Sequence, residues 1–382
     1  MLDKSFGIYI HWPFCAFKCP YCDFNSHVRR REIDQKIYAQ AYAKELQFMA
    51  MHTGSRKVTS IFIGGGTPSL MEPATLEIIL DNIYKYWSVS DKVEITLEAN
   101  PTSVEANKFY QFNKLGVNRL SLGVQALNDN DLIKLGRKHS VKQALYAIET
   151  ARDIFNRLSF DLIYARPEQT LEQWQEELNY AIDLAADHLS LYQLTIEPNT
   201  HFYYLYKADK LKMLNEEEFA TLYEETQKIT QARGLIGYEI SNYAKPGAES
   251  IHNLLYWQYG DYIGVGAGAH GRFIKDTPNK YVTITEKLPE RWLNLVLANG
   301  HGIVEEETLT PQQQGDELLL MGLRLRQGVD LSIYEKLTGK KLDKLTNSLQ
   351  KQGLVNLYNK NWLQVTPKGR LLVDYILKCL VY

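Results

Sequence analysis

The sequence has no surplus of charge of either sign and no long apolar run. Its 382 residues include 43 lysines and arginines against 45 aspartates and glutamates, which gives a net charge of −2. This balance argues against a general nucleic-acid binder and a strongly basic membrane-surface protein. No run of about 18 apolar residues predicts a membrane span. The N-terminal segment lacks the apolar core of a signal peptide, so we expect a cytoplasmic protein.

Cysteine is scarce, with four in the chain. Three of them, Cys15, Cys19 and Cys22, form a C-x3-C-x2-C pattern in "CAFKCPYC". In a reducing compartment such a group indicates a metal site rather than disulfides. A closed zinc site would need a fourth ligand, for which His11 or His27 is available. The spacing fits three corners of a [4Fe–4S] cluster better, with the fourth iron open to an exchangeable ligand.

Apolar strand-like runs alternate with longer helical patterns from residue 7 to about residue 200. The helical patterns include residues 33–50 and 74–87, where apolar residues recur at three- and four-residue spacing. Alternating strands and helices predict a parallel sheet, and six units are too few for a closed eight-stranded barrel. We therefore predict an α/β fold, a partial (β/α)6 barrel. The expected strands are residues 7–11, 60–64, 93–98, 119–124, 157–164 and 188–194.

Glycine and polar residues follow these strands, where parallel folds place their chemistry. The second strand runs into "GGGTP" (64–68), the third ends at Glu98, Gln125 follows the fourth, and the fifth carries Asp161. Glycines permit close approach, and exposed backbone groups at such a turn can hold the ammonium and carboxylate of a bound amino acid. A second glycine-rich stretch, "GVGAGAHG" (264–271), lacks a βαβ frame, which argues against dinucleotide binding. It is expected either to line a ligand pocket or, as the favoured alternative, to make a close backbone packing contact.

The cysteine loop, with the aromatic Tyr21 before its last cysteine, resembles that of radical S-adenosylmethionine (SAM) proteins. There the open iron chelates the amino and carboxylate groups of SAM, and the aromatic covers the cluster. The segments "YIHWPFC", "GGGTPS", "LEANP", "RLSLGVQ", "GRKHS" and "FDLIYARPEQT" follow in the order of the oxygen-independent coproporphyrinogen III oxidase family. That resemblance implies SAM contacts from Tyr9, Gly65, Gly66, Thr67, Glu98, Gln125, Arg137 and Asp161.

Two features separate the branches of this family. The decarboxylating oxidases have a further cysteine two residues after the third, where this chain has Phe24, and a longer N-terminal extension. The chain resembles instead the heme-chaperone (HemW-like) branch. "HNLLYW" also resembles a hallmark of that branch, which implies heme contacts from His252, Tyr256 and Trp257. Imidazole is a common axial ligand of heme iron, and Tyr256 would share a helix face with His252.

The resemblance implies a heme chaperone that binds heme and transfers it to acceptor proteins, while carrying a [4Fe–4S] cluster and exchangeable SAM. Respiratory enzymes would be the acceptors, with transient membrane association. A homodimer and SAM turnover are left open, and no catalytic residue is assigned. The alternatives are a radical SAM enzyme, either the coproporphyrinogen III decarboxylase or another porphyrin-modifying enzyme, and a zinc-dependent interaction protein.

After residue 300 the alternation ends, so we expect a second domain over residues 301–382. Residues 305–342 are helical in pattern, and residues 345–377 indicate a helix, a hairpin around Asn359 and another helix, as in a winged-helix unit. Without a concentration of basic residues, this unit is expected to cover the open barrel rather than bind DNA. Cys379 is expected to pack as a small apolar side chain.

Overall fold

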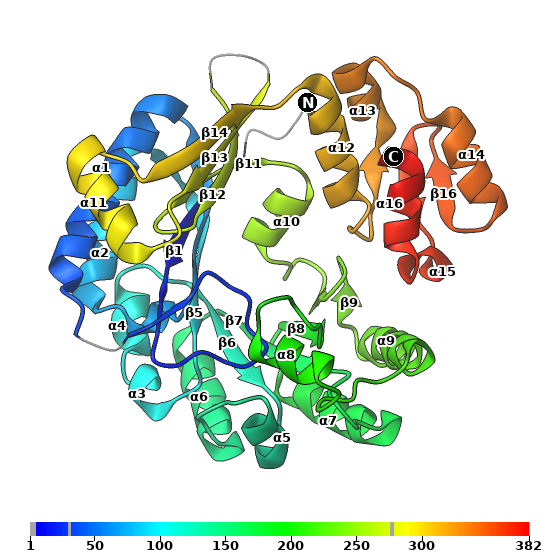
Figure 1. Cartoon of the computed structure of the whole chain (residues 1–382), viewed down its shortest axis with the longest axis horizontal. Helices are drawn as coiled ribbons and strands as arrows, with labels where there is room; N and C mark the ends of the chain where they lie inside the picture. Colours follow the sequence, from blue (N-terminus) through cyan, green and yellow to red (C-terminus); the bar gives the residue numbers. More distant parts are fainter. Residues whose placement is uncertain (1–4, 30–31, 276–278, 382) are drawn as a thin grey trace.

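The computed structural model describes residues 5–29, 32–275 and 279–381. One sheet of 12 strands dominates it, in the order β14-β13-β12-β11-β1-β4-β5-β6-β7-β8-β10-β9. Figure 1 shows the sheet curving through the molecule, with helices on its outer side. Because the sheet has two unpaired ends in the described residues, the barrel is partial, as the sequence predicted.

All six predicted strands are present, and each runs parallel to the next. A seventh parallel strand, β11 (Asp261–Val265), pairs with the other edge of the first and was not predicted. Antiparallel strands extend both ends: β12 (His270–Ile274), β13 (Lys280–Thr285) and β14 (Ile303–Thr308) at one, β10 (Asn242–Ala244) and β9 (Ile236–Gly237) at the other. The predicted six are β1 (Phe6–Trp12), β4 (Lys57–Gly65), β5 (Ser88–Ala99), β6 (Arg119–Gln125), β7 (Arg157–Tyr164) and β8 (His188–Gln193).

Helices connect the parallel strands, and local sequence signals start several of them. Capping boxes begin α6 at Ser140 and α7 at Thr170, each with a glutamine three residues later. None of the helices in the described ranges is long and apolar enough to cross a membrane. The helices of the barrel are α1 (Gln35–Thr53), α2 (Pro73–Tyr86), α3 (Ser103–Ala106), α4 (Phe109–Lys114), α5 (Asp129–Lys134), α6 (Val141–Ile154), α7 (Leu171–Leu184), α8 (His201–Lys207), α9 (Glu216–Ala232) and α11 (Pro289–Asn299).

The two faces of the parallel sheet differ in chemistry. Residues that are paired in register on neighbouring strands lie on the same face of the sheet. The side chains on the outer face pack against the helices and form the main hydrophobic core with them. They include Ile61, Ile95, Leu120, Phe160 and Leu189. The opposite face, inside the partial barrel, is largely polar; it includes Ser60, Glu94, Thr96, Glu98, Arg119, Ser121, Ser159, Asp161, His188 and Ser190. The barrel interior is therefore built to hold polar groups, whereas the layer between sheet and helices supplies the apolar burial.

The stretch "GVGAGAHG" forms the turn after β11, and its predicted close packing is confirmed. Gly266 has φ +107°, and a Cβ there would lie 2.3 Å from the carbonyl oxygen of His11. A Cβ on Gly268 would lie 2.3 Å from the Asn25 side chain. The carboxylate of Glu45 accepts from the backbone N–H groups of Gly266 and Gly302 and from the Trp292 indole. This turn therefore supports the end of β1, where the cysteine loop begins.

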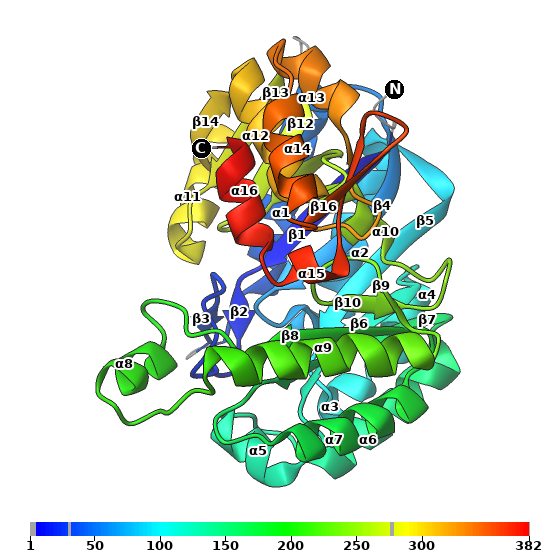
Figure 2. The same ribbon diagram turned by 90° about the vertical axis from the view of Figure 1, so that its right-hand side faces the viewer.

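The C-terminal segment forms a second unit with its own core (Figure 2). A three-stranded antiparallel sheet packs with helices, and the predicted hairpin around Asn359 joins two of its strands. Tyr259, from the loop before β11, is buried in this second core. The elements are α12 (Pro311–Gly322), β15 (Val329–Asp330), α13 (Leu331–Thr338), α14 (Asp343–Lys351), β16 (Val355–Tyr358), β17 (Trp362–Val365), α15 (Pro367–Arg370) and α16 (Val373–Val381). Cys379 is partly buried against this core, as expected.

One expectation for this region is wrong. Residues 305–308 were expected to be helical, but they belong to β14, which pairs with β13 at the sheet edge. Glu305, Glu306 and Glu307 are exposed there, and charged side chains are typical of an edge strand. The boundary at residues 300/301 remains a prediction; β14 belongs to the main sheet, while the second core draws on residues from Leu318 onward.

Candidate functional site

The cysteine loop leaves β1 and is closed at its base by two short parallel strands. β2 (Phe14–Cys15) pairs with β3 (His27–Val28). Inside the loop, Lys18 Nζ donates to the carbonyl oxygens of Phe24 at 3.0 Å and Ser26 at 3.3 Å. These bonds cross the loop and hold it compact, so its three cysteines face a common space.

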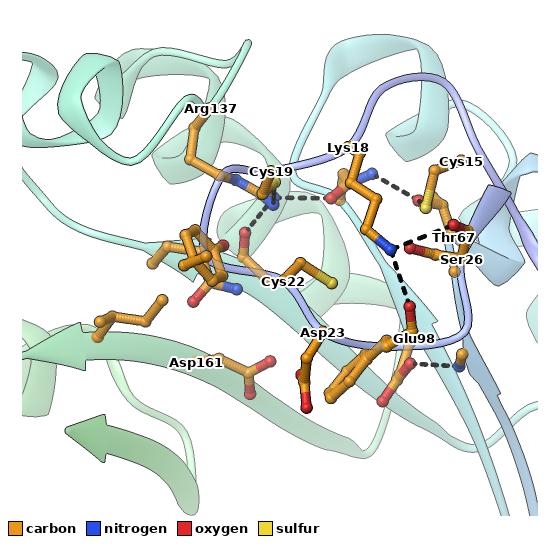
Figure 3. A pocket seen from close by; sticks show the side chains of 18 of the residues that line it. Cys15, Lys18, Cys19, Cys22, Asp23, Ser26, Thr67, Glu98, Arg137 and Asp161 are labelled. Atoms are coloured by element: carbon orange, nitrogen blue, oxygen red, sulfur yellow. Dashed lines mark hydrogen bonds between the residues drawn. The ribbon is translucent and has the colours of Figure 1, made fainter. Parts of the chain in front are cut away.

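That space is a cavity of about 370 Å³ at the carboxyl ends of the parallel strands. Its volume lies in the lower part of the range of small-molecule sites. Figure 3 shows the cysteine loop arching over Glu98 and Asp161. The lining includes all eleven residues, other than Tyr9, that the sequence assigned to the cluster and SAM: Cys15, Cys19, Tyr21, Cys22, Gly65, Gly66, Thr67, Glu98, Gln125, Arg137 and Asp161.

Two of the cysteine sulfurs receive hydrogen bonds. Thr67 Oγ1 lies 3.4 Å from Cys15 Sγ, and Arg137 Nη1 lies 3.3 Å from Cys19 Sγ. Burial raises the pKa of the Cys15 and Cys22 thiols, so a bound cation or cluster is needed to favour their thiolates. Donors aimed at sulfur are a usual feature of cluster sites, and the donor set fits a three-cysteine [4Fe–4S] cluster.

The zinc alternative fits the structure less well. In the described ranges no group of three or more His, Cys, Asp or Glu side chains is arranged to hold a single metal ion. His11 Nε2 is bound to the carbonyl of Asn25 at 2.9 Å, and His27 Nε2 lies near Asn25 Oδ1 and the carbonyl of Lys287. Neither histidine lines the cavity. Both proposed fourth ligands are therefore engaged elsewhere.

The "GGGTP" stretch lines the cavity, but its backbone N–H groups bond within the protein. The backbone N–H of Gly65 donates to Glu98 Oε2 at 3.1 Å, that of Gly66 to Trp12 O, and that of Thr67 to Phe14 O. These three N–H groups are therefore engaged within the protein and cannot hold a ligand carboxylate. The glycines serve close packing: a Cβ on Gly65 would lie 2.6 Å from the His11 ring, and one on Gly66 2.7 Å from Phe14 O.

Two carboxyl groups, Glu98 and Asp161, define the floor of the cavity. Burial, together with the charge of Asp161, raises the pKa of Glu98 to about 8. Burial also raises the pKa of Asp161 to about 6, although hydrogen bonds from Ser190 and Ser121 act in the opposite direction and lower it. Near neutral pH Glu98 is therefore protonated in the free site. A positive charge or hydrogen-bond donors from a ligand would favour its ionised form.

Tyr9 lies outside the cavity lining. Burial lowers the pKa of His11 to about 4, so the ring is neutral. Because a carbonyl only accepts, His11 donates from Nε2 to Asn25 O, which leaves Nδ1 to accept from the Tyr9 hydroxyl at 2.9 Å. The Tyr9 ring stacks on Phe62 at 6.2 Å between centroids. Tyr9 therefore orients His11, which in turn bonds to the backbone of the cysteine loop at Asn25, and neither side chain lines the cavity.

The "HNLLYW" motif forms α10 (Ile251–Trp257), which lies between the barrel and α12 (Figure 1). His252 is buried, and its Nδ1 lies 3.0 Å from Ser60 Oγ. Burial lowers its pKa to about 3, so the ring is neutral. Tyr256 is 40% exposed and packs against Trp257 and Tyr262. The His252 ring lies near Tyr9 and Phe62 inside the barrel, whereas the rings nearest Tyr256 are those of Trp257 and Tyr262.

Sequence reasoning left several lining residues unassigned. Asn100 lines the cavity and bonds to both Thr67 and Arg137. Its place in "LEANP", directly after a strand end, was a usable signal. Tyr192 and Glu197 also line the cavity, from the end of β8 and the segment after it. No motif marked them, because the polar residues after that strand are spread over several positions.

Comparisons with known proteins identify families and relatives that this chain resembles. The radical SAM superfamily profile matches residues 9–181, and the HemN C-terminal domain profile matches residues 309–372. Heme chaperone HemW of Haemophilus influenzae is 35% identical over 97% of each chain, and that of Escherichia coli is 34% identical over 97% of each. A zebrafish (Danio rerio) relative, the mitochondrial radical S-adenosyl methionine domain-containing protein 1, is 38% identical over 86% of this chain and 75% of its own.

A solved structure shows the same fold. Coproporphyrinogen III oxidase HemN of Escherichia coli, a radical SAM enzyme, superposes with a TM-score of 0.82 over 98% of this chain and 90% of its own, at 24% identity. This likeness concerns the fold, whereas the identity to the HemW proteins extends over nearly the full length of both chains. The chain therefore belongs to the HemW-like family of radical SAM proteins.

Proposed function

We propose that this protein is a heme chaperone that binds heme and hands it to acceptor proteins. The observation that carries the proposal is the nearly full-length similarity to proteins named heme chaperone HemW. Phe24, 58% exposed on the cysteine loop, stands where the decarboxylating branch has a further cysteine, and it supports the same assignment. We place the protein in the cytoplasm, with respiratory enzymes as acceptors and membrane association only through them.

The cavity is proposed to hold the cluster and SAM. Cys15, Cys19 and Cys22 would ligate three irons and leave the fourth to the amino and carboxylate groups of SAM. Such a cluster supplies one-electron reductive cleavage of SAM. The chain's own contribution is to position the ligand: Glu98 and Asp161 would bind its polar groups, and Arg137 would hold the loop. Tyr21, which packs on Phe202 at 6.3 Å between centroids, would cover the cluster.

Heme is proposed to bind at α10, with His252 as axial ligand and the rings of Tyr256 and Trp257 against the porphyrin. The neutral imidazole of His252 is the form that ligates metal. Its Nδ1 is engaged with Ser60 Oγ at 3.0 Å while α10 lies against the barrel, and either ring nitrogen can ligate iron once this contact is released. Because His252 is buried, heme binding in this mode requires α10 to move away from the barrel.

The charge of the cavity disfavours the alternative, decarboxylation of coproporphyrinogen III. That substrate carries several propionates and would need free cations. The two cations in the lining are engaged: Lys18 with backbone carbonyls, and Arg137 with Asn100, Gly123 and Cys19. The lining carboxyl groups are Asp23, Glu98, Asp161 and Glu197. An acidic lining suits the positive sulfonium of SAM better than a polycarboxylate.

Heme titration of the anaerobically reconstituted protein tests the proposal. We expect stoichiometric binding, seen as a shifted Soret band, and no conversion of coproporphyrinogen III with SAM and a reductant. His252→Ala should weaken heme binding, whereas His270→Ala, which changes an exposed residue of β12, is the control. Formation of protoporphyrinogen would identify an oxidase instead, and equal heme binding by both variants would refute His252 as ligand.

A further inference from the structure

Asn100 connects the two side chains that donate hydrogen bonds to the cysteine sulfurs. Its Oδ1 lies 2.7 Å from Arg137 Nη2, and its Nδ2 lies 3.3 Å from Thr67 Oγ1. On the far side of each partner is a sulfur, Cys19 Sγ at 3.3 Å from Arg137 and Cys15 Sγ at 3.4 Å from Thr67. A continuous hydrogen-bonded path therefore joins two of the three cysteines through a single amide.

The chemistry of the groups fixes the direction of every bond in this path. Arginine has donors only, so the atom of Asn100 that faces Arg137 must be the oxygen. The amide NH2 of Asn100 then faces Thr67 and donates to its hydroxyl oxygen. The hydroxyl proton of Thr67 is thereby directed to Cys15 Sγ. Asn100, as an amide with one donor end and one acceptor end, therefore contacts both groups that donate to sulfur, and on the Arg137 side the Gly123 carbonyl oxygen is a second acceptor at 2.8 Å.

The backbone holds Asn100 firmly in this place. Its N–H donates to Glu105 Oε2 at 2.9 Å, and Ser69 and Thr102 also bond to the Glu105 carboxylate. Pro101, which follows directly, restricts the backbone dihedrals of Asn100. The side chain is therefore positioned by a buried carboxylate network rather than by the cysteine loop itself.

We propose that Asn100 is a positioning residue that directs two hydrogen bonds to the cluster thiolates and thereby raises the reduction potential of the cluster. Hydrogen bonds to the sulfurs stabilise the reduced, more negative cluster. Without Asn100, the Thr67 hydroxyl is free to turn away from Cys15, and Arg137 loses one acceptor. The proposal rests on the proposed cluster site. A wild-type protein that binds no cluster would refute that site, whereas the role of Asn100 is tested on protein that has bound its cluster.

The test is the midpoint potential of the reconstituted protein, followed by electron paramagnetic resonance without SAM. Asn100→Ala should shift the potential to more negative values. Asn118→Ala is the matched control, because Asn118 bonds the backbone of Val93 and Ile95 in the middle of β5, has no hydrogen bond to the described residues of the cysteine loop, and should leave the potential unchanged. An unchanged potential in Asn100→Ala, or equal shifts in both variants, would overturn the proposal.

A double-mutant cycle with Thr67→Val tests the route. If Asn100 acts through the Thr67 hydroxyl, its substitution should shift the potential less in the Thr67→Val background than in the wild type. Additive shifts would overturn this route. Electron–nuclear double resonance in H2O and D2O should show the loss of one exchangeable proton near the reduced cluster in Asn100→Ala. Asn100→Asp keeps the shape, and it replaces Asn100→Ala in every comparison if the alanine variant does not load a cluster.

Discussion

The raised pKa of Glu98 predicts that SAM binding depends on pH. The pKa of this carboxyl is about 8 in the free site, because the group is buried near Asp161. SAM carries a sulfonium and an amine, and positive charge or donors beside Glu98 favour the carboxylate. Binding should therefore release a proton from Glu98 at any pH below about 8. The affinity should rise with pH toward that value and level off above it.

The size of the effect follows from the difference between the pH of the solution and the pKa of Glu98. At pH 6, two units below the pKa of about 8, ionising Glu98 costs about 2.7 kcal/mol. SAM should therefore bind about 100-fold more weakly at pH 6 than well above pH 8, and about 50-fold more weakly than at pH 8 itself, where half of the Glu98 groups are already ionised, if the bound site keeps Glu98 ionised. Asp161→Asn removes the neighbouring negative charge. It should lower the pKa of Glu98 and move the rise in affinity to lower pH.

Anaerobic titration calorimetry of the cluster-loaded protein measures this directly. The enthalpy of SAM binding in two buffers with different ionisation enthalpies gives the number of protons released. Glu98→Gln is the control, because protons released by SAM itself remain while those of Glu98 disappear. The same proton release and the same pH profile in wild type and Glu98→Gln would refute the reasoning.

Three further predictions concern the cysteine loop and its support. Serine in place of any one loop cysteine should abolish cluster binding but preserve heme binding, measured by iron and sulfide analysis and by Soret titration; joint loss in a folded protein would contradict separate sites. Glu45→Ala should lower the free energy of unfolding, measured in urea, by about 4 kcal/mol. The reason is that three buried donors lose their acceptor, at a cost of roughly 1–3 kcal/mol each. A loss below about 1 kcal/mol would show that water replaces the carboxylate. Gly266→Ala should lower the melting temperature and cluster content more than Gly300→Ala, because both have positive φ but only Gly266 meets a neighbouring backbone oxygen; equal losses would attribute the effect to φ alone.

The sequence predicted the parallel strands well because their burial is encoded locally. Each of the six has apolar residues that pack on helices, and several of them end at or run into polar or glycine residues. Strands at the sheet ends were harder to predict. β14 carries three exposed glutamates and is held by pairing with β13, and β11 is a five-residue strand between loops. In both, the partner strand supplies the information that the local sequence lacks.

The candidate site was predictable as a set of residues but not in its internal bonding. The lining residues converge because the carboxyl ends of parallel strands share one edge. The partners of the "GGGTP" amides come from Trp12, Phe14 and Glu98, which lie far away in the sequence. The burial of His252 depends in the same way on Ser60 and Phe62 of β4. Such long-range contacts leave no local pattern, so the assigned roles of these residues needed the structure.

The burial of Tyr259 in the second core has a consequence for how the protein unfolds. Tyr259 lies two residues beyond α10, and Lys280 of β13 binds its carbonyl oxygen at 2.8 Å while the Lys280 ammonium lies 4.2 Å from the centroid of its ring. Opening of the C-terminal unit would expose this ring and remove one of the two supports of the segment that follows α10, while the Lys280 bond from the main sheet remains. The stability of the proposed heme helix is therefore coupled to a unit that lies late in the chain. During synthesis α10 would gain its final support only after residues 318–380 have folded.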